Sequence, residues 1–529
     1  MGRPWRALAV LCLANFLILL DTTIVNTAAP DIMAGIGAGI DDVLWVLNGY
    51  LLAFASLLII FGRIGDLVGP RAVFVAGLAL FTAASVLCGL SGTPGLLIAA
   101  RVLQGIGAAA LVPQALVLIS AIFPAERRGA AFGIFTAVAG VAAVSGPTVG
   151  GLLITHLGWQ SVFYLNVPFG LLGLLLAVRF VPDPRSRRPH RFDLVGVVLA
   201  TFALLGLVYG LVEGQRHDWG TIAGPIGIPL VFAVSAALGV GFVRWERRRR
   251  EPLVPPALFR DRDYPIATAI TLLTSFSMYG LLLVFVLETQ TLLGMSPLMS
   301  GVTALPWTVA LSAVAPFGGR LADRVGGRIL LVVGLSVYAL GVLGVAFLTG
   351  PGASFGTFLA PMLAVGVGMG LAVAPTTTEA MRGVPPDLAG AASGVLNTAR
   401  QVGAALGAAV IGAVLQNRLV AALRAEAVTL ADRLPEASRP RFLAGFEDAV
   451  ARGLQLGTGQ HGGIPVPADL PPDQAARFAG LVREAFDTAF AAAARPALVV
   501  VAGAVLLGGA LATRMTAPVP VAAQGKPRG

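Results

Sequence analysis

The stretch AVAGVAAVSGPTVGG, residues 137–151, lies within an apolar run that extends over about residues 129–157. This run can cross a bilayer as one helix, which takes about 20 residues. The proline after Gly146 removes a backbone donor and crowds the preceding turn, so we expect a kink there. Gly146 and Gly150 stand one turn apart, the spacing that lets a neighbouring helix approach closely. Spacing alone also fits a generic kinked helix, because glycine and proline are frequent in membrane spans.

The composition of the chain is that of a polytopic membrane protein. Of its 529 residues, 56% are apolar and only 12% are charged, a balance that no soluble protein needs. The formal net charge of +10 comes from arginines in short loops between apolar runs. This pattern indicates membrane orientation and argues against a nucleic-acid partner. We therefore expect a multi-pass protein in the cell membrane.

Little in the sequence supports an enzyme. Lys526 is the only lysine, so the phosphate-binding lysine of a P-loop is missing and ATP hydrolysis by that route is excluded. The four histidines form no recognisable catalytic constellation. Cys12 and Cys88 both lie in apolar runs, so we expect neither a disulfide framework nor a zinc site. The sequence predicts no cofactor and no metal site.

Fourteen apolar runs are predicted to cross the membrane. Their approximate bounds are residues 7–29, 43–62, 72–91, 95–115, 130–156, 162–181, 193–213, 222–243, 265–288, 299–318, 329–349, 354–376, 394–415 and 496–514. Short loops after even-numbered runs carry arginines, among them Arg127, Arg188 and Arg250, whereas short loops after odd-numbered runs carry almost none. By the positive-inside rule, both termini are predicted to be cytoplasmic.

Two pairs of segments repeat within the chain. GRIGDLVGPR at 62–71 follows the second run, and GRLADRVGGR at 319–328 follows the tenth. A second echo, GAAFG at 129–133 and GAASG at 390–394, opens the fifth and thirteenth runs. Equivalent segments therefore lie eight runs apart. This offset predicts an all-α membrane fold of two six-helix bundles, related as parallel repeats, with a helix pair inserted between them.

This architecture divides the chain into five parts. They are an N-terminal six-helix bundle (1–181), an inserted helix pair with basic cytoplasmic linkers (182–263), the first five helices of the C-terminal bundle (264–415), an extracytoplasmic insertion (416–495), and the last helix with a cytoplasmic tail (496–529). Within the insertion, residues 473–494 place apolar side chains at helical spacing, which predicts an amphipathic helix. We interpret 416–495 as an inserted loop region rather than as a cap on the outer mouth.

The repeated loops have a physical logic. A carboxylate at a span end can bind the free N–H groups of a helix N-terminus together with an arginine, and so hold neighbouring helices together on the cytoplasmic side. Glycines permit the tight turns. We predict a cytoplasmic gate at the following residues: Gly62, Asp66, Gly69, Arg71, Gly319, Asp323 and Arg328. An ordinary polar loop is the alternative, which the gapless recurrence disfavours.

The motifs resemble those of the major facilitator superfamily, and within it the fourteen-span drug:proton antiporters. The segment 62–71 is similar to the loop between the second and third helices of that superfamily, although the family usually has arginine where Leu67 stands. LIAARVLQGIGAAALVP at 97–113 is similar to its fourth-helix motif, and LLDTTIVNTAAP at 19–30 to the first-helix motif of the fourteen-span group. Further matches lie at 158–170, 290–297 and 396–407. The opening stretch resembles the fifth-helix motif of exporters, carried here by Gly140, Gly146, Pro147, Gly150 and Gly151.

Charged residues inside the predicted spans are the strongest functional candidates. Asp21 lies within the first span, where a charged side chain costs about 2.5–3.5 kcal/mol, so it should face water or be protonated. We predict that Asp21 carries the coupling proton and that Arg101 of the fourth span is its partner. Two alternatives stay open. Asp21 could have a purely structural role, in which it hydrogen-bonds Thr22, Thr23 or Asn26 and orients the helix. Arg101 could be a structural bridge to a backbone carbonyl.

A cavity for an organic molecule needs a few polar groups in apolar surroundings. The candidates are Asn26, Gln114, Gln290, Trp307, Asn397 and Gln401. Three other charged residues are interpreted as peripheral. Arg400 is expected to snorkel to the cytoplasmic face. Glu213 and Glu288 are expected at the solvated outer rim, and whether either shares in coupling is left open.

The resemblance implies a secondary exporter of amphipathic or cationic organic compounds, such as drugs or antibiotics, that works by proton antiport and alternating access. The alternative is a translocator of lipid or another membrane component, or a partner-bound scaffold, that uses the same fold without proton coupling. Asp21 discriminates between them, because a proton-driven exporter needs a titratable group. The expected partners are a small organic substrate, protons and the lipid bilayer, with no nucleic acid, and the protein is expected to be a monomer.

Overall fold

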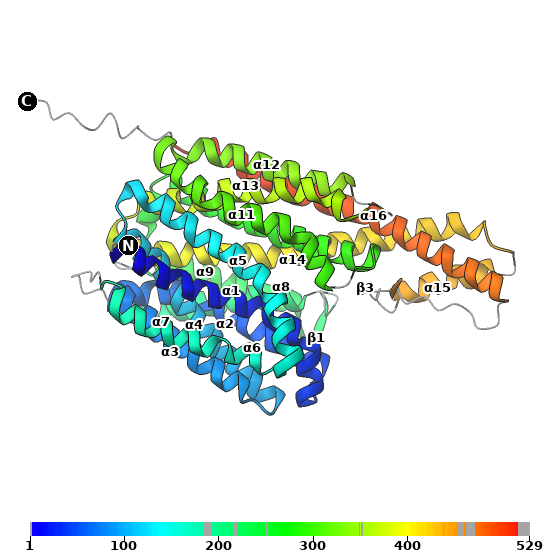
Figure 1. Cartoon of the computed structure of the whole chain (residues 1–529), viewed down its shortest axis with the longest axis horizontal. Helices are drawn as coiled ribbons and strands as arrows, with labels where there is room; N and C mark the ends of the chain where they lie inside the picture. The colour runs from blue at the N-terminus through cyan, green and yellow to red at the C-terminus, as the bar shows by residue number, and fades with distance from the viewer. Residues whose placement is uncertain are drawn as a thin grey trace, which may run out of the picture.

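The computed structural model shows an elongated molecule built almost entirely from helices that run along one common direction (Figure 1). It describes residues 3–516 except 184–192, 215, 216, 218, 250, 251, 296, 349, 351, 352, 437, 452–455, 458, 459 and 462–470. Arg188 and Arg250, two of the predicted cytoplasmic arginines, therefore lie outside the described residues. α1 (Arg3–Ile36) begins and α16 (Pro472–Ala512) ends at the same end of the molecule. We call this end the termini side and the opposite end the extension side.

The N-terminal bundle consists of seven helical segments. They are α1, α2 (Ile40–Val68), α3 (Pro70–Gly89), α4 (Pro94–Ile122), α5 (Ala125–Leu157), α6 (Ser161–Tyr164) and α7 (Asn166–Phe180). The start of α4 is an example of a helix end that is fixed by the local sequence, here by a capping threonine and a proline. The Thr93 side chain accepts the N–H of Leu96 at 3.4 Å, and Pro94 has the fixed φ that suits a first helical position.

The inserted pair and the C-terminal bundle follow along the chain. The pair comprises α8 (Leu194–Glu213), the antiparallel strands β1 (Thr221–Ala223) and β2 (Ile226–Gly227), and α9 (Ile228–Glu246). After η1 (Pro256–Phe259), the C-terminal bundle contains α10 (Asp263–Leu287), η2 (Glu288–Leu292), α11 (Pro297–Val325), α12 (Gly327–Leu348), α13 (Phe355–Arg382), η3 (Pro386–Leu388), α14 (Ala389–Ala431) and α16. Between α14 and α16 lie α15 (Arg439–Ala451) and the paired strands β3 (Leu456–Gly457) and β4 (Gln460–His461).

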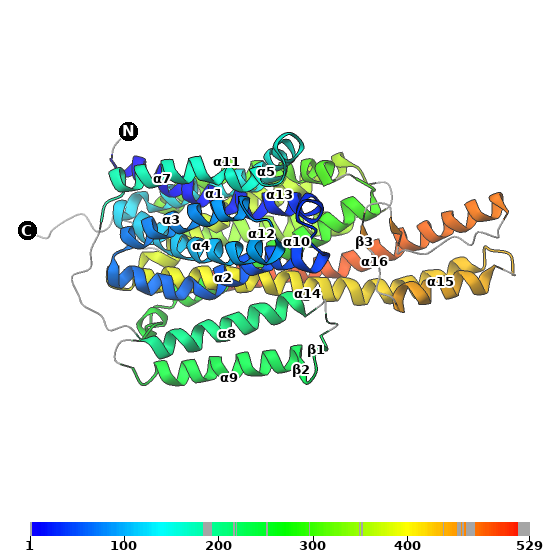
Figure 2. The same cartoon turned by 90° about the horizontal axis from the view of Figure 1, so that it is seen from below.

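The inserted pair lies beside the two bundles rather than within either of them. α8 packs against α2 and α14, whereas α9 packs mainly against α8 (Figure 2). The pair thus covers the seam where α2 of one bundle meets α14 of the other. The predicted eighth span at 222–243 begins instead with the β1–β2 hairpin, because Gly224 adopts φ 54° and turns the chain before the helix starts.

The structure confirms an all-α membrane fold but not the full count of spans. Thirteen helices of the described chain are long and apolar enough to cross a membrane. They correspond to thirteen of the fourteen predicted spans. α5 is a helix of 33 residues that packs against α1 and α11, but it is not among the thirteen. The number fourteen therefore stays a prediction.

The segment 416–495 is largely helical, and the helix predicted at 473–494 is confirmed as part of α16. α14 continues to Ala431 and α16 already begins at Pro472, so both helices project beyond the bundles, and α15 packs against α14 (Figure 1). The ring centroids of Phe442 and Phe478 lie 5.2 Å apart, within a small apolar core of this projection. The apolar runs thus end before the helices do, and the helices continue with an apolar face that packs within the projection. The predicted boundaries at 415 and 495 consequently fall inside helices.

The two copies of the repeated loop have similar backbones. Gly69, between α2 and α3, has φ 108°, and Gly326, between α11 and α12, has φ 85°. Such positive φ values favour glycine, because a Cβ atom would clash with the backbone. Each copy therefore ends its helix with a turn that requires glycine, and the aspartate lies in the last helical turn before it.

Candidate functional site

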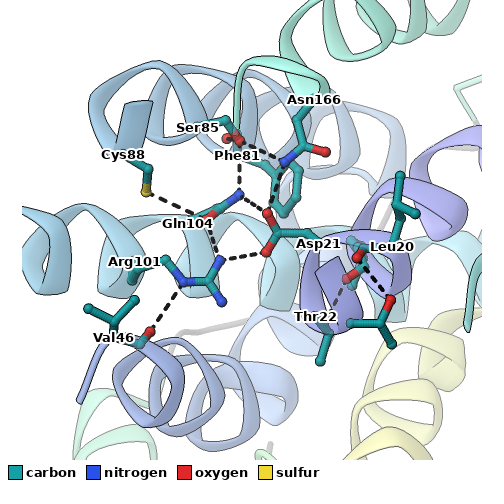
Figure 3. A network of polar contacts seen from close by, with 12 residues as sticks. Leu20, Asp21, Thr22, Val46, Phe81, Ser85, Cys88, Arg101, Gln104 and Asn166 are labelled. Carbon is teal, nitrogen blue, oxygen red and sulfur yellow. Dashed lines mark hydrogen bonds and ion pairs between the residues drawn. The ribbon is translucent and has the colours of Figure 1, made fainter. Parts of the chain in front are cut away.

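Asp21 of α1 lies at the centre of a buried polar network in the N-terminal bundle (Figure 3). Its side chain is 0% exposed. Its Oδ2 accepts a hydrogen bond from Nη1 of Arg101 at 2.5 Å, and its Oδ1 accepts from Nε2 of Gln104 at 2.8 Å and from Nδ2 of Asn166 at 2.9 Å. Donors on both oxygens compensate the charged carboxylate for the loss of water.

Arg101 of α4 is held by groups from α2 as well as by Asp21. Its Nε donates to the carbonyl oxygen of Val46 at 3.2 Å, and its Nη1 also donates to Oε1 of Gln104 at 2.6 Å. The guanidinium carbon lies 4.3 Å from the centre of the Tyr50 ring, which is a cation–π distance. Arg101 therefore makes both contacts that the sequence left open: it pairs with Asp21 and it bridges to a backbone carbonyl.

Sequence reasoning does not identify Ser85, Gln104 or Asn166 as members of this network. The Ser85 hydroxyl of α3 accepts from Nε2 of Gln104 at 2.9 Å and from Nδ2 of Asn166 at 3.4 Å. A signal was available, because both amides lie in apolar segments, where a buried polar group needs a partner. Gln104 also follows Arg101 by one helical turn.

The alternative partners of Asp21 bond elsewhere. Thr22 donates to the carbonyl of Ile18 at 2.8 Å, and Asn26 donates to that of Thr22 at 3.1 Å. Thr23 likewise donates to carbonyls of its own helix. The Asp21 carboxylate thus bonds residues of α4 and α7 rather than its neighbours on α1, which ties three helices to one ionisable group.

A second carboxylate, that of Asp66, joins the two bundles on the termini side. Its Oδ1 accepts the N–H of Gly390 at 2.8 Å, and its Oδ2 accepts the N–H of Ala391 at 3.0 Å. These are free N–H groups of the first turn of α14, where the helix dipole also favours negative charge. Nη1 of Arg63 lies 3.8 Å from the same carboxylate. The carboxylate of α2 thus binds a helix N-terminus of the opposite bundle.

Asp323 of α11 makes the equivalent contact in the other direction. Its Oδ1 accepts the N–H of Gly129 at 2.9 Å, and its Oδ2 accepts the N–H of Ala130 at 3.1 Å. Both donors lie near the start of α5, in the turn that follows its first four residues. Each copy of the repeated loop is therefore bonded to a copy of the second echo, and each contact joins one bundle to the other.

Glycines allow the helices to cross closely beside these carboxylates. A Cβ atom on Gly62 would collide with the backbone of Gly390, and a Cβ atom on Gly319 would collide with the backbone of Gly129. Because the obstacle in each case is backbone, the helices would have to move apart to accommodate a side chain. The glycines at these four positions thus permit the closed contact on the termini side.

The arginines of the predicted gate lie apart from the carboxylates. Nη2 of Arg71 donates to the carbonyl of Val178 at 2.5 Å and so fixes α3 to α7. Arg328 is half-buried, and no hydrogen bond or ion pair of its side chain occurs among the residues described. Arg63, which the sequence did not single out, is the arginine nearest to Asp66.

Glu379 of α13 adds a contact that only the C-terminal half requires. Its Oε1 accepts the N–H of Gly327 at 2.7 Å at the start of α12, and its Oε2 lies 2.9 Å from Nη1 of Arg382. The residue equivalent to Gly327 in the first loop is Pro70, which has no N–H to satisfy. This difference explains why an acid is needed here in one half only.

The exporter-like stretch of α5 faces two different helices. Gly140 lies against Ser312 of α11, whose hydroxyl donates to the carbonyl of Ala137 at 3.0 Å. Gly146 and Gly150 lie against Thr23 and Ile24 of α1, just beyond Asp21. A Cβ atom on Gly151 would meet no described atom within 4 Å, and the side chain of Pro147, on which the expected kink rests, lies outside the described residues. α5 therefore links the helix of Asp21 to the C-terminal bundle.

The six predicted cavity residues do not form one cluster. Gln114 donates to the carbonyl of Phe61 at 2.6 Å near the gate, Trp307 donates to the sulfur of Met369 at 3.2 Å, and Asn397 donates to the carbonyl of Ser393 at 2.9 Å. Asn26 is exposed, whereas Gln290 and Gln401 are half-buried. Within the described part of the chain, no hydrogen bond joins any two of the six. Their contribution to a substrate cavity stays a prediction.

Three expectations about peripheral charges are wrong. Glu288 is 0% exposed and begins the π-helical segment η2, and Glu213 is 2% exposed. Asn48 of α2 donates to Oε1 of Glu213 at 3.3 Å, because the end of α8 packs against α2. Neither acid lies at a solvated rim. Arg400 does not reach the end of α14 either: it lies eleven residues after Ala389, or about 16 Å along the helix axis, and donates to Oδ1 of Asn397 at 3.2 Å.

Comparisons with known proteins agree with this arrangement. The sequence profile of the Major Facilitator Superfamily matches residues 11–408. The multidrug resistance protein Stp of Mycobacterium tuberculosis is 38% identical over 413 residues, which cover 78% of this chain and 76% of Stp. The tetracenomycin C resistance and export protein of Streptomyces glaucescens is 35% identical over 527 residues, covering 98% of this chain and 93% of that protein.

A solved structure shows the same fold at low sequence identity. The human organic anion transporter MFSD10 (TETRAN) superimposes with a TM-score of 0.59 and 14% identity, covering 97% of this chain and all of that one. The profile match, the two relatives and the two-bundle architecture identify a multi-pass transporter of the cell membrane rather than an enzyme. The chain belongs to the Major Facilitator Superfamily.

Proposed function

We propose that this protein exports amphipathic organic compounds in exchange for protons, by alternating access. The observation that carries the proposal is the fully buried Asp21 carboxylate, which is paired with Arg101 and bonded by amides from two helices. An ionisable group at this depth is costly, and in membrane proteins such groups mark ion and proton pathways. The names of the relatives support drugs or antibiotics as the substrate class.

Protonation of Asp21 changes its contacts in a definite way. A neutral carboxyl group attracts the Arg101 guanidinium much less and can accept fewer hydrogen bonds. α1 would then be held less firmly to α4 and α7. The reverse step, release of the proton, restores the ion pair. The carboxyl group thus provides two states with different strengths of attachment between α1 and the rest of the N-terminal bundle.

α5 provides a route from this site to the gate. Its Gly146 and Gly150 contact α1 just beyond Asp21, and Gly129, near its start, is bonded to Asp323 of α11. A shift of α1 therefore acts on a helix whose other end forms half of the closed contact on the termini side. We propose that loading of the proton favours opening of this contact, so that protons and substrate are exchanged between the two sides.

The driving force is sufficient for export. A proton that enters across 100 mV contributes about 2.3 kcal/mol, and each unit of pH difference adds about 1.4 kcal/mol. These values support concentration gradients of tenfold to a hundredfold and more for one proton per substrate, since each 1.4 kcal/mol corresponds to about a factor of ten.

The direct test is transport by purified protein in liposomes. A fluorescent amphipathic dye is offered outside vesicles with an acidic lumen, and its uptake is followed with and without a proton ionophore. We expect the dye to accumulate inside the vesicles against its concentration gradient, carried by the protein molecules whose termini side faces outward. This accumulation should collapse when the pH gradient is dissipated. Dye movement that ignores the gradient would contradict proton antiport and favour the translocator alternative. Absence of any movement would favour a scaffold.

A further inference from the structure

The described partners of the Asp21 carboxylate are all donors. They are Nη1 of Arg101 at 2.5 Å, Nε2 of Gln104 at 2.8 Å and Nδ2 of Asn166 at 2.9 Å. A carboxylate without its proton can accept from all three, whereas a carboxyl group carries an O–H that must itself find an acceptor. The arrangement therefore fits the unloaded form of Asp21, and at least one of the three partners must change when a proton binds.

Only the two amides among these partners can become acceptors. A guanidinium group has donors alone, but an amide that turns by about half a rotation presents its oxygen in place of its nitrogen. The oxygen of Gln104 is already in use, because Oε1 accepts from Nη1 of Arg101 at 2.6 Å and from Sγ of Cys88 at 3.7 Å. A turn of the Gln104 amide would break both of these contacts.

The amide of Asn166 is free to turn. Asn166 is 1% exposed, and its Oδ1 has no hydrogen-bond partner among the described residues. Figure 3 shows this oxygen pointing away from Asp21. A buried polar atom without a partner is unfavourable and calls for an explanation. Besides the bond to Asp21, a turn would give up only the long contact of Nδ2 with Ser85 at 3.4 Å.

Close packing of α7 on α3 holds this amide in place. Asn166 is the first residue of α7. One turn later, Gly170 lies so close to Thr82 of α3 that a Cβ atom on it would collide with Oγ1 of Thr82. Ser85 follows Thr82 by about one turn of α3. The close approach therefore keeps the Asn166 amide between Ser85 and Asp21.

We propose that the Asn166 amide turns with the protonation state of Asp21. It donates through Nδ2 to the carboxylate and accepts through its own Oδ1 from the loaded carboxyl group. The proton comes from water and forms an O–H bond at Oδ1 of Asp21; release returns it to water, and no covalent bond of Asn166 changes. This inference rests on the proposed function and assigns a positioning residue to the same site.

The turn keeps α7 attached to α1 in both states. The loaded form replaces a charge-assisted hydrogen bond by a neutral one, which is weaker. The Arg101 guanidinium cannot turn in this way and loses its ion pair. Most of the loosening that follows protonation therefore falls between α1 and α4, while Asn166 holds the carboxyl group in a defined orientation for release of the proton.

Few ionisable groups lie around this carboxyl group. The charged or titratable side chains that face the site are Arg101 of α4, Cys88 of α3 and Tyr50 of α2. Arginine stays charged, and ordinary thiols and phenols lose their protons only above about pH 8. Among the described residues, no other charged or titratable side chain bonds to Asp21. Asp21 is therefore the group whose proton the amide follows.

The test is infrared difference spectroscopy of the protein in nanodiscs, recorded between acidic and alkaline pH. Asparagine with a heavy-carbon side-chain carbonyl marks the amide, and loss of a carboxyl band in Asp21→Asn identifies the band of Asp21. We expect the labelled carbonyl band to move to lower frequency with the same pH midpoint as the carboxyl band, because accepting a hydrogen bond weakens a C=O bond. Asn166→Leu should abolish this movement.

Asn15 provides a matched control on α1. It is a second buried asparagine, and its Nδ2 donates to the carbonyl of Phe135 at 3.4 Å. Asn15→Leu should leave the movement of the labelled band unchanged. Loss of the movement in Asn15→Leu but not in Asn166→Leu would overturn the proposal.

The pH midpoint of the carboxyl band in Asn166→Leu separates turning from a purely donating role. Loss of a donor alone would remove one charge-assisted bond to the carboxylate and raise the midpoint by about one to two pH units. If the amide serves both states, the variant also loses the acceptor of the O–H group. The two losses then offset each other, and we expect the midpoint to move by less than about one unit. A rise of about one unit or more would overturn the proposal.

The spectra of the unaltered protein decide the question even if Asn166→Leu does not fold. A titrating Asp21 band without any change of the asparagine carbonyl would overturn the turning amide and leave proton coupling standing. Absence of a titrating Asp21 band would overturn both this inference and the proposed proton antiport.

Discussion

Oδ1 of Asp66 accepts the N–H of Gly390 at 2.8 Å across the boundary between the two bundles. The internal repeat relates this contact to the one between Asp323 and Gly129, at 2.9 Å. Each half of the molecule therefore contributes one carboxylate and the beginning of one helix to the contact between the bundles on the termini side. Because each bundle holds the other through equivalent groups, we expect this predicted gate to open only when both contacts break.

The first prediction concerns the carboxylate of α2. Asp66→Ala removes two hydrogen bonds to a charged acceptor, each worth about 1.5–3 kcal/mol, and should shift the molecule toward conformations that are open on the termini side. Spin labels at Val68 and Val325, which are 63% and 48% exposed on opposite bundles, should report longer distances, and transport should fall.

Leu67→Ala is the matched control for Asp66→Ala. It alters the neighbouring side chain of the same loop but leaves both hydrogen bonds to α14 in place. Equal transport by the two variants at equal membrane abundance would show that the Asp66 contact is dispensable.

The second prediction concerns the helix crossing beside Asp323. Gly319→Ala adds a Cβ atom that collides with the backbone of Gly129, so α5 and α11 cannot reach their closed separation. We expect a loss of the closed gate and of uphill transport. Gly301→Ala on the same helix meets no described atom within 4 Å and should be neutral or slightly stabilising, since alanine favours helices. Normal transport by Gly319→Ala would contradict the close crossing.

The third prediction concerns orientation in the membrane. Val428 lies on the projecting part of α14 and is 62% exposed, and Arg127 is exposed on the termini side. The arginine bias predicts that the termini side faces the cytoplasm. A membrane-impermeant maleimide should therefore label Val428→Cys but not Arg127→Cys in intact cells, while the native Cys12 and Cys88 are buried. The opposite labelling pattern would contradict this prediction and show that the termini side faces outward.

Much of the fold could be predicted because hydrophobic length and internal repeats are sequence properties. The repeated loops predicted two related bundles with an inserted pair, and the depth of Asp21 and Arg101 marked them as unusual. The crosswise contacts could not be derived in the same way. Alignment of the two repeated loops shows that Asp66 is equivalent to Asp323. Only the tertiary structure shows that Asp66 bonds the repeated segment at 390–394 and that Asp323 bonds the one at 129–133.

The errors share a physical cause. Apolar runs report where lipid contact ends, not where a helix ends or which face of it is covered. α14 and α16 therefore continue past the predicted ends of their spans, so the predicted insertion at 416–495 begins and ends inside helices that project beyond the bundles. Glu213 and Glu288 lie at such predicted ends, yet protein covers them. Arg400 was misplaced for the related reason that its span began earlier than expected.

The central claim is that Asp21 carries the coupling proton, and the most direct test is Asp21→Asn in proteoliposomes. Asparagine keeps the size and much of the hydrogen bonding of the aspartate but cannot titrate. We predict that the variant folds, exchanges labelled substrate across the membrane, and fails to accumulate it when a pH difference is imposed. Full uphill transport driven by the pH difference in Asp21→Asn would contradict the account and place the coupling group elsewhere, with the buried Glu288 as the next acid to test.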